Sequence, residues 1–177
     1  VANGGVLMQP MLVRAIRDAD GREIRRGTPQ PSHRVFSGAT ASTLLDMLCA
    51  VVDSGTATSA RIPQMRIAGK TGTAQKYDAA VGTYGHGMYL ASFAGIAPAD
   101  HPRLVGVVVI DEPRGAQYYG GQVAAPVFRE VILDLERMSW PGFDATSSAV
   151  AMRPPSVPAV TAPDLRLLPP REAERRL

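Results

Sequence analysis

The chain has 177 residues, of which 45% are hydrophobic and 20% charged, as expected for one globular domain that buries a sizeable core. Its formal net charge of +3 is not gathered into a basic cluster with interleaved aromatic residues, so nucleic-acid binding is not predicted. Cys49 is the only cysteine, which excludes an internal disulfide and a thiolate metal site. Its apolar neighbours predict a buried side chain.

Hydrophobic periodicity and turn residues predict strands and helices along the first 140 residues. In chain order they are the end of a helix at 1–5, strands at 11–17 and 23–26, a helix at 38–54, strands at 65–75, 89–96 and 103–110, and a helix at 121–138. Asp20-Gly21 is a strong hairpin signal between the first two strands. Residues 76–87 contain three glycines and little periodicity, so a mobile loop is expected there. Because the first element is a helix end, we expect a C-terminal piece of a larger protein.

The connections between the last three expected strands are short, which predicts antiparallel pairing. An antiparallel sheet flanked by helices is an α+β fold. The β-branched run 105–110 has the character of a central strand covered on both faces. Seven of the fifteen prolines lie in residues 141–177, which lack apolar periodicity. We therefore divide the chain into a folded part, 1–140, and a Pro-rich, disordered tail, 141–177.

The most informative motif is Lys70-Thr71-Gly72-Thr73. Lys70 is one of only two lysines, and it places a flexible ammonium beside two hydroxyls on a backbone without bulk at Gly69 or Gly72. Such a strip can bind a carboxylate and let the backbone of a substrate approach closely. Lys-Thr-Gly is also one of three signature motifs of the serine acyl-transfer enzymes that recognise penicillins.

The motif has two other interpretations. Gly69-Lys70-Thr71 matches the end of a phosphate-binding P-loop, but a P-loop needs a glycine five positions before Gly69, where this chain has Gln64. It also needs a helix directly afterwards, where Gly72 and Thr73 favour continued strand. The second alternative is a chance Lys-Thr-Gly on a surface strand. The order of the surrounding elements makes chance the weaker explanation.

Other chemistry-bearing residues form no convincing cluster. His33, His86 and His101 lie in expected loops without ligand-like spacing, so no metal site is predicted. Asp111 and Glu112 are adjacent at a strand end, and they are expected to point to opposite faces and not to cooperate.

Residues 1 to about 140 resemble the C-terminal part of the transpeptidase domain of class B penicillin-binding proteins, the division-specific penicillin-binding protein 3 type in particular. The matching stretches occur in the expected order and are 2–5, 52–57, 68–74, 93–98 and 125–128. The chain departs from the family pattern because it contains neither the Ser-x-x-Lys nucleophile motif nor Ser-x-Asn. The nucleophile and general base are therefore expected in an upstream half of the same protein.

The resemblance implies a serine D,D-transpeptidase that cross-links peptidoglycan stem peptides through a serine ester and is acylated by β-lactam antibiotics. The implied catalytic residues are Lys70, which supplies positive potential, and Thr73, whose backbone N–H is an oxyanion donor. The implied substrate-binding residues are Lys70, Thr71, Gly72, Thr73, Tyr89, Tyr118, Tyr119 and Gly120. The resemblance implies no metal and no organic cofactor.

The resemblance also implies a periplasmic domain, anchored in the inner membrane through an upstream segment and acting with other division proteins at the septum. A β-lactamase or D,D-carboxypeptidase of the same superfamily is an alternative, since it would share the Lys-Thr-Gly strand but hydrolyse its acyl-enzyme. A non-catalytic penicillin-binding-like module is an alternative of a different class. Acylation of the complete polypeptide at its active site would exclude the module.

Overall fold

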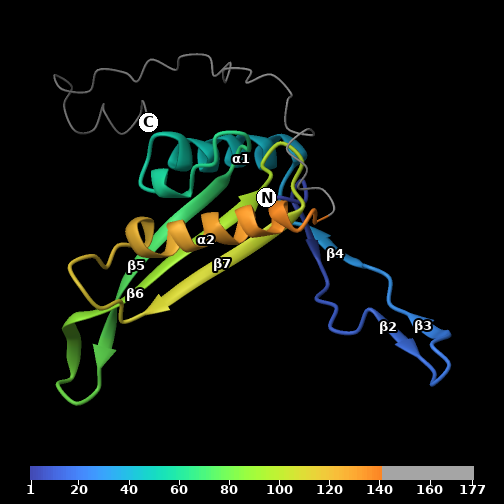
Figure 1. The fold of residues 1–177 in the computed structure, drawn as a ribbon, viewed down its shortest axis with the longest axis horizontal. Coiled ribbons are helices and arrows are strands. Elements are labelled where there is room, and N and C mark those ends of the chain that lie inside the picture. The colour runs from blue at the N-terminus through green and yellow to red at the C-terminus, as the bar shows by residue number, and fades with distance from the viewer. Residues whose placement is uncertain (141–177) are drawn as a thin grey trace, which may run out of the picture.

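The computed structural model describes residues 1–140, apart from the side chain of His86 (Figure 1). The expected tail, 141–177, lies outside the described residues. The strands and helices are β1 (Val6–Met8), β2 (Ala15–Arg17), β3 (Glu23–Arg26), β4 (Pro31–Arg34), α1 (Gly38–Asp53), the short 3-10 helix η1 (Thr58–Ala60), β5 (Ala68–Asp78), β6 (Thr83–Ala97), β7 (Leu104–Asp111) and α2 (Gly120–Arg137). Within residues 1–140, no helix combines the length and apolarity needed to cross a bilayer.

The central element is an antiparallel sheet in the order β5-β6-β7, as the short connections predict. Its register pairs Lys70 with Ala94 and Ala94 with Val107. Since successive side chains in a strand point to opposite faces, the register also assigns each residue of the sheet to a face. The α+β prediction is confirmed.

Helix α2 covers one face of this sheet (Figure 1). Its Phe128 is buried and packs edge-on against Phe93 of β6, with ring centroids 5.2 Å apart. Glycines allow this approach, because a Cβ at Gly95 would lie 2.5 Å from Phe128 Cζ and a Cβ at Gly106 would lie 3.0 Å from Phe128 Cε2. The Phe128 ring therefore occupies the space that side chains at Gly95 and Gly106 would fill.

Helix α1 packs against the opposite face at the β5 end of the sheet. It begins at Ser37, whose hydroxyl accepts a hydrogen bond from the amide of Thr40, as in a typical N-cap. Cys49 is fully buried, as predicted, in a cluster with Ala68 and Ile96. The helix thereby fixes the position at which β5 enters the sheet.

The expected loop at 76–87 is wrong, because β5 and β6 continue through most of it as a long hairpin. Tyr77 and Tyr84 are paired across the strands and their rings meet edge-on at 5.9 Å. Gly82, with φ 72°, lies in the turn. Both tyrosines are exposed, so the hairpin extends beyond the core and has no apolar periodicity to reveal it.

Strand β7 is a sheet edge among the described residues, and the prediction that it is covered on both faces is wrong here. Val105, Val107 and Val109 are 63%, 66% and 54% exposed. The alternate residues, Val108 among them, pack toward α2. One face of the strand is therefore buried, and the valine face opposite is open.

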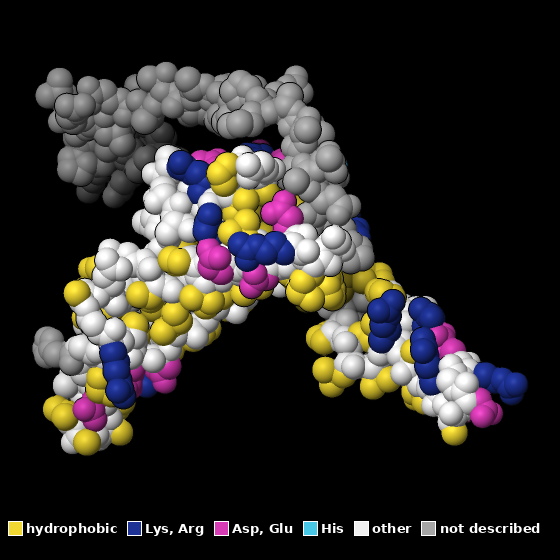
Figure 2. Space-filling view, in the orientation of Figure 1, with side chains coloured by type: hydrophobic (Ala, Val, Ile, Leu, Met, Phe, Trp, Pro, Cys, Tyr) yellow, Lys and Arg dark blue, Asp and Glu magenta, His cyan; other side chains and the backbone are white. Residues whose placement is uncertain are grey.

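The first part of the chain forms an arm of two ribbons, β1 with β4 and β2 with β3, which projects away from the sheet (Figure 1). The predicted turn at Asp20-Gly21 is confirmed, with Gly21 at φ 81°. The strand expected at 11–17 covers only Ala15–Arg17, and the β1–β4 pair was not predicted. Figure 2 shows Lys and Arg side chains gathered along this arm.

A turn occupies the first residues, where a helix end was expected. The amide of Gly4 donates to the carbonyl of Val1 over 3.2 Å, three residues back. Gly4 and Gly5 have φ values of 60° and 85°, in the left-handed region that glycine adopts readily.

Candidate active site on strand β5

The motif Lys70-Thr71-Gly72-Thr73 lies on β5, which is an edge strand of the sheet among the described residues. Lys70 is exposed, and its Nζ donates to the carbonyl of Thr71 over 2.8 Å. A Cβ at Gly72 would lie 2.5 Å from Ser92 Oγ, so a side chain here would displace the Ser92 hydroxyl. Within residues 1–140 the motif therefore presents the unpaired backbone of an edge strand with the Lys70 ammonium beside it.

The two threonines of the motif point to the α2 side of the sheet, because their partners Phe93 and Ala91 lie on that face. Thr71 Oγ1 lies 2.9 Å from Thr56 Oγ1, in a hydrogen bond that either hydroxyl can donate. Thr73 Oγ1 accepts a hydrogen bond of 3.1 Å from the backbone N–H of Gly120. Each motif hydroxyl thus has a hydrogen-bond partner from a segment distant in sequence.

The N-terminus of α2 is pressed against β5 at the motif. A Cβ at Gly120 would overlap the carbonyl oxygens of Ser92 and Gly72, and a Cβ at Gly121 would overlap the carbonyl oxygen of Thr56. Only residues without side chains allow the helix to begin here. The positive end of the helix dipole and its first amides therefore lie beside the two hydroxyls, an arrangement that favours an anion.

Three tyrosines form an aromatic wall. Tyr89 stacks on Tyr118 with centroids 4.1 Å apart and planes 14° from parallel, and Tyr118 and Tyr119 are 4.4 Å apart. The Tyr118 hydroxyl donates to that of Tyr119 over 3.2 Å, and this hydrogen bond with the neighbouring phenol raises the pKa of Tyr118 to about 12. Tyr118 is therefore a neutral hydrogen-bonding group at neutral pH. The structure brings together the tyrosines that the sequence singled out, next to the start of α2.

Lys76, the second lysine, has a different environment from Lys70. Its Nζ lies 2.9 Å from Asp111 Oδ1 and 2.7 Å from Glu112 Oε1. The expectation that these two carboxylates diverge is wrong, because Glu112 adopts φ 49° and its carboxylate reaches the same ammonium as that of Asp111. The hydrogen bonds that Lys76 donates to Glu112 and Asp111 raise its pKa. This exposed cluster joins β5 to the end of β7 and compensates the charge of Lys76.

The predicted site residues converge on one region: the four motif residues on β5, Tyr89 on β6, and the segment Tyr118–Gly120 at the start of α2. Sequence reasoning assigned no role to Thr56, which contacts Thr71, or to Gly121, which packs against Thr56. Thr56 lies in the stretch 52–57 that resembles the family, and Gly121 belongs to a Gly-Gly pair at the start of a helix, but neither signal specifies a contact with the motif. Within residues 1–140 no three potential metal-binding side chains come together.

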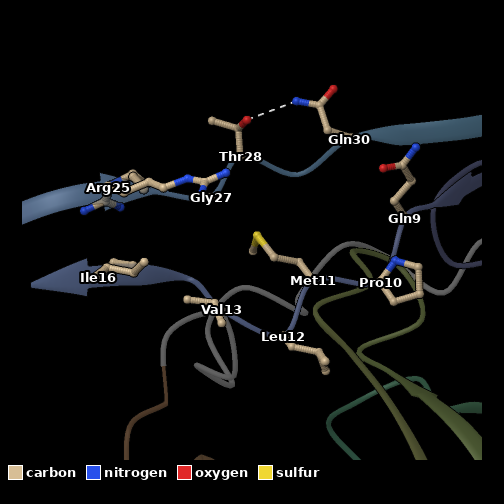
Figure 3. Close-up of a pocket in the computed structure, with 12 residues that line it drawn as sticks. Gln9, Pro10, Met11, Leu12, Val13, Ile16, Arg25, Gly27, Thr28 and Gln30 are labelled. Carbon is tan, nitrogen blue, oxygen red and sulfur yellow. Dashed lines mark hydrogen bonds between the residues drawn. The ribbon is translucent and has the colours of Figure 1, made fainter.

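A hollow of about 640 Å³ lies in the arm and not at the motif (Figure 3). It lies between the two ribbons, where the segment 9–13 that connects β1 to β2 faces Gly27, Thr28 and Gln30 of the segment that connects β3 to β4. None of the predicted site residues lines it. The candidate site is instead an open strip along β5, as expected for a surface that binds an extended chain.

Comparison with known proteins agrees with this geometry. The sequence profile of the "Penicillin binding protein transpeptidase domain" matches residues 1–133. The chain belongs to the penicillin-binding protein transpeptidase family. The matched sequence includes the arm, α1, the motif strand and most of α2.

Curated members of this transpeptidase family are similar over most of the chain. The penicillin-binding protein PbpB of Mycolicibacterium smegmatis is 40% identical over 139 residues, which are 74% of this chain and 21% of that protein. The peptidoglycan D,D-transpeptidase FtsI homolog of Mesostigma viride is 34% identical over 173 residues, 91% of this chain and 27% of that protein. The chain thus spans about a quarter of these relatives.

A solved structure of the same family has a similar fold. Penicillin-binding protein 3 of Mycobacterium tuberculosis, complexed with aztreonam, gives a TM-score of 0.67 at 37% identity, covering 78% of this chain and 32% of that one. The antiparallel sheet and its two helices therefore belong to a known penicillin-binding transpeptidase architecture.

Proposed function

We propose that this chain is part of a serine D,D-transpeptidase that cross-links peptidoglycan stem peptides during septal cell-wall synthesis and is acylated by β-lactams. The observation that carries the proposal is the strip on β5: an exposed ammonium, two hydroxyls and an open strand edge, next to the start of a helix. Such a strip can pair with an extended peptide and hold its terminal carboxylate. Both a stem peptide and a ring-opened penicillin present such a carboxylate.

Each motif residue takes a distinct role in the proposal. The Lys70 ammonium supplies positive potential toward the carboxylate and the reacting centre. The hydroxyls of Thr71 and Thr73 donate to the carboxylate. The proton of Thr73 is available because its oxygen accepts from the Gly120 N–H. Gly72 keeps the strand accessible to the acyl chain, and the Thr73 backbone N–H is one of two oxyanion donors.

The tyrosine wall and Gly120 complete the substrate-binding surface in this proposal. Tyr89 and Tyr118 are rigid through stacking, so they can limit one side of the cleft at little entropic cost. Tyr119 lies beside them and is exposed. Gly120 allows the backbone of α2 to reach Thr73.

The remaining parts of the enzyme are assigned to the rest of the polypeptide. The serine nucleophile and its lysine base belong to an upstream half, together with a segment that anchors a periplasmic domain in the inner membrane. The names of relatives, a peptidoglycan D,D-transpeptidase among them, and the aztreonam complex of a structural neighbour support this assignment. We also propose division proteins as partners of the complete polypeptide.

The experiment that tests the function is acylation by labelled penicillin in a polypeptide that contains the complete transpeptidase domain. Lys70→Ala should slow acylation roughly 100-fold, the scale of losing one electrostatic group that stabilises the transition state. The fold should be unchanged, because Lys70 is exposed and its only hydrogen bond among residues 1–140 is to a neighbouring carbonyl.

Lys76→Ala is the matched control. It removes the other lysine of the same strand, whose charge is compensated by Asp111 and Glu112. Exposed ion pairs contribute about 0–1 kcal/mol to stability, so this variant should be acylated like the wild type. Equal acylation of the wild type and Lys70→Ala would contradict the proposed role of the motif. Rapid release of the acyl group as a hydrolysed product would favour a β-lactamase or carboxypeptidase.

A further inference from the structure

Thr56 lies in a rigid turn that follows α1. The next residue, Ala57, is fully buried, and its amide donates to the carbonyl of Val51 over 3.1 Å. On the other side a Cβ at Gly121 would overlap the Thr56 carbonyl oxygen, so the start of α2 packs directly on this residue. Thr56 is therefore held between two helices, while its side chain remains exposed.

The hydroxyl of Thr56 meets the motif strand at one point. Its Oγ1 lies 2.9 Å from Thr71 Oγ1. A threonine hydroxyl has one proton to donate and two lone pairs to accept with. When Thr56 donates to Thr71, the proton of Thr71 is left for another acceptor, and when Thr71 donates to Thr56, its proton is used.

Thr73 has a partner that can only donate a hydrogen bond. The backbone N–H of Gly120 can only donate, so Thr73 Oγ1 accepts there, and its own proton remains available. The two threonines flank Gly72 and share one face of β5. A carboxylate bound between them would receive one proton from each, provided that Thr56 acts toward Thr71 as Gly120 acts toward Thr73.

We propose that Thr56 is a positioning residue for carboxylate recognition: it donates to Thr71 Oγ1 and thereby directs the Thr71 proton toward the carboxylate of the bound substrate or β-lactam. The inference rests on the proposed function. A carboxylate selects this orientation because a hydrogen bond to an ionised acceptor is about twice as strong as a neutral one. In the free protein the two hydroxyls can exchange roles, and binding an anion fixes the direction.

The alternative is a purely structural contact that ties the turn after α1 to β5. A structural role would affect all acyl donors equally, whereas a positioning role depends on the carboxylate of the ligand. The two are separated by comparing benzylpenicillin with its methyl ester, which has the same ring system but no anion. The informative quantity is the ratio of their second-order acylation rate constants.

The test uses a polypeptide with the complete transpeptidase domain and intact-mass spectrometry of the acyl-enzyme. Thr56→Val keeps the shape and removes the hydroxyl. It should slow acylation by benzylpenicillin about 2- to 10-fold, the scale of one neutral hydrogen bond, because Thr71 keeps its proton but loses the contact that orients it, and it should leave the methyl ester rate unchanged. Thr56→Ser should restore most of the benzylpenicillin rate, because it keeps the hydroxyl.

Thr58→Val is the matched control, since Thr58 is an exposed threonine of the same segment and should leave both rates unchanged. Thr56→Ala provides a second hydroxyl-free variant should the valine perturb the turn, and circular dichroism compares the folds. Equal slowing of both donors, or no slowing of either, would overturn the positioning role while the proposed function stands. A wild-type polypeptide that forms no adduct with either donor would overturn both.

Discussion

Lys70 and Lys76 are on the same strand, and their surroundings give them different roles. Lys76 is bound by Asp111 and Glu112, so its charge is compensated. Lys70 is exposed and has no carboxylate within ion-pair distance among residues 1–140. One lysine therefore strengthens the sheet end, and the other provides positive potential at the strand edge.

Cys49 is the residue whose ionisation is most clearly linked to the fold. Burial penalises the thiolate and raises the pKa of Cys49 from 9.0 to about 11. A raised pKa means that the folded state binds the proton more tightly than the unfolded state. The resulting stabilisation is complete below pH 9 and is lost as the pH rises toward 11.

We predict that Cys49→Ala lowers the free energy of unfolding by roughly 0.5–3 kcal/mol at pH 8, as for most buried truncations. The difference in melting temperature from the wild type should shrink between pH 8 and pH 11, because only the wild type loses the thiol contribution. Thermal melts of both proteins at the two pH values measure it. A constant difference would show that the thiol does not titrate as its burial implies.

At the scale of elements, α2 and the sheet are joined by one aromatic side chain over two glycines. Phe128 fills the space above Gly95 and Gly106, and it meets Phe93 edge-on. This contact sets the height of the helix above the sheet. It also sets where Gly120, at the helix start, meets Thr73. Packing in the core thereby positions a hydrogen bond of the candidate site.

We predict that Phe128→Ala, in a polypeptide with the complete transpeptidase domain, lowers the free energy of unfolding by about 3–5 kcal/mol. Gly95→Ala should cost about 1–3 kcal/mol, because its Cβ overlaps the Phe128 ring, and Gly106→Ala should cost less. In the Phe128→Ala background, Gly95→Ala should cost less than it does alone, and the remaining cost reflects Phe93, whose Cε1 would lie 2.8 Å from the new Cβ. Chemical denaturation measures all four, and strictly additive values would contradict the packing described.

The long hairpin of β5 and β6 shows where element prediction from sequence fails. Residues 76–87 pair as strands because neighbouring backbone groups are already in register from the sheet, with Tyr77 opposite Tyr84. The hairpin extends past the core, so it needs no alternating apolar pattern. Periodicity detects a face that is buried, and this segment has none.

At the scale of the whole molecule, the candidate site is incomplete in this chain. The sequence contains the carboxylate-binding strip but no Ser-x-x-Lys motif, and a nucleophile and its base act as a unit. The valine face of β7 is also open among the described residues. Both observations favour a surface that another part of the polypeptide completes.

We predict that the isolated 177-residue chain forms no covalent adduct with labelled penicillin and is poorly soluble, since an exposed apolar face promotes association. Adding the upstream half in trans, or expressing the intact polypeptide, should recover both labelling and solubility. Intact-mass spectrometry after incubation with penicillin gives the answer. A stoichiometric adduct on the chain alone would mean that the nucleophile has been misplaced.

Taken by itself, the sequence determined the elements that have a buried face. The helices at 38–54 and 121–138, the antiparallel order of the last three strands and burial of Cys49 follow from periodicity, short connections and apolar neighbours, and the structure agrees. The Lys70 motif could be recognised because its residues are contiguous. Local chemistry and local spacing are readable without coordinates.

Only the tertiary structure decided how distant residues meet at the strand edge. Thr56 reaches Thr71, and Gly120 reaches Thr73, through the packing of α1 and α2 on the sheet, which no local pattern encodes. The contact of both Asp111 and Glu112 with the Lys76 ammonium likewise depends on the left-handed backbone conformation of Glu112. Hydrogen bonds between segments far apart in sequence are set by the docking of whole elements, and that docking depends on shape complementarity across the core.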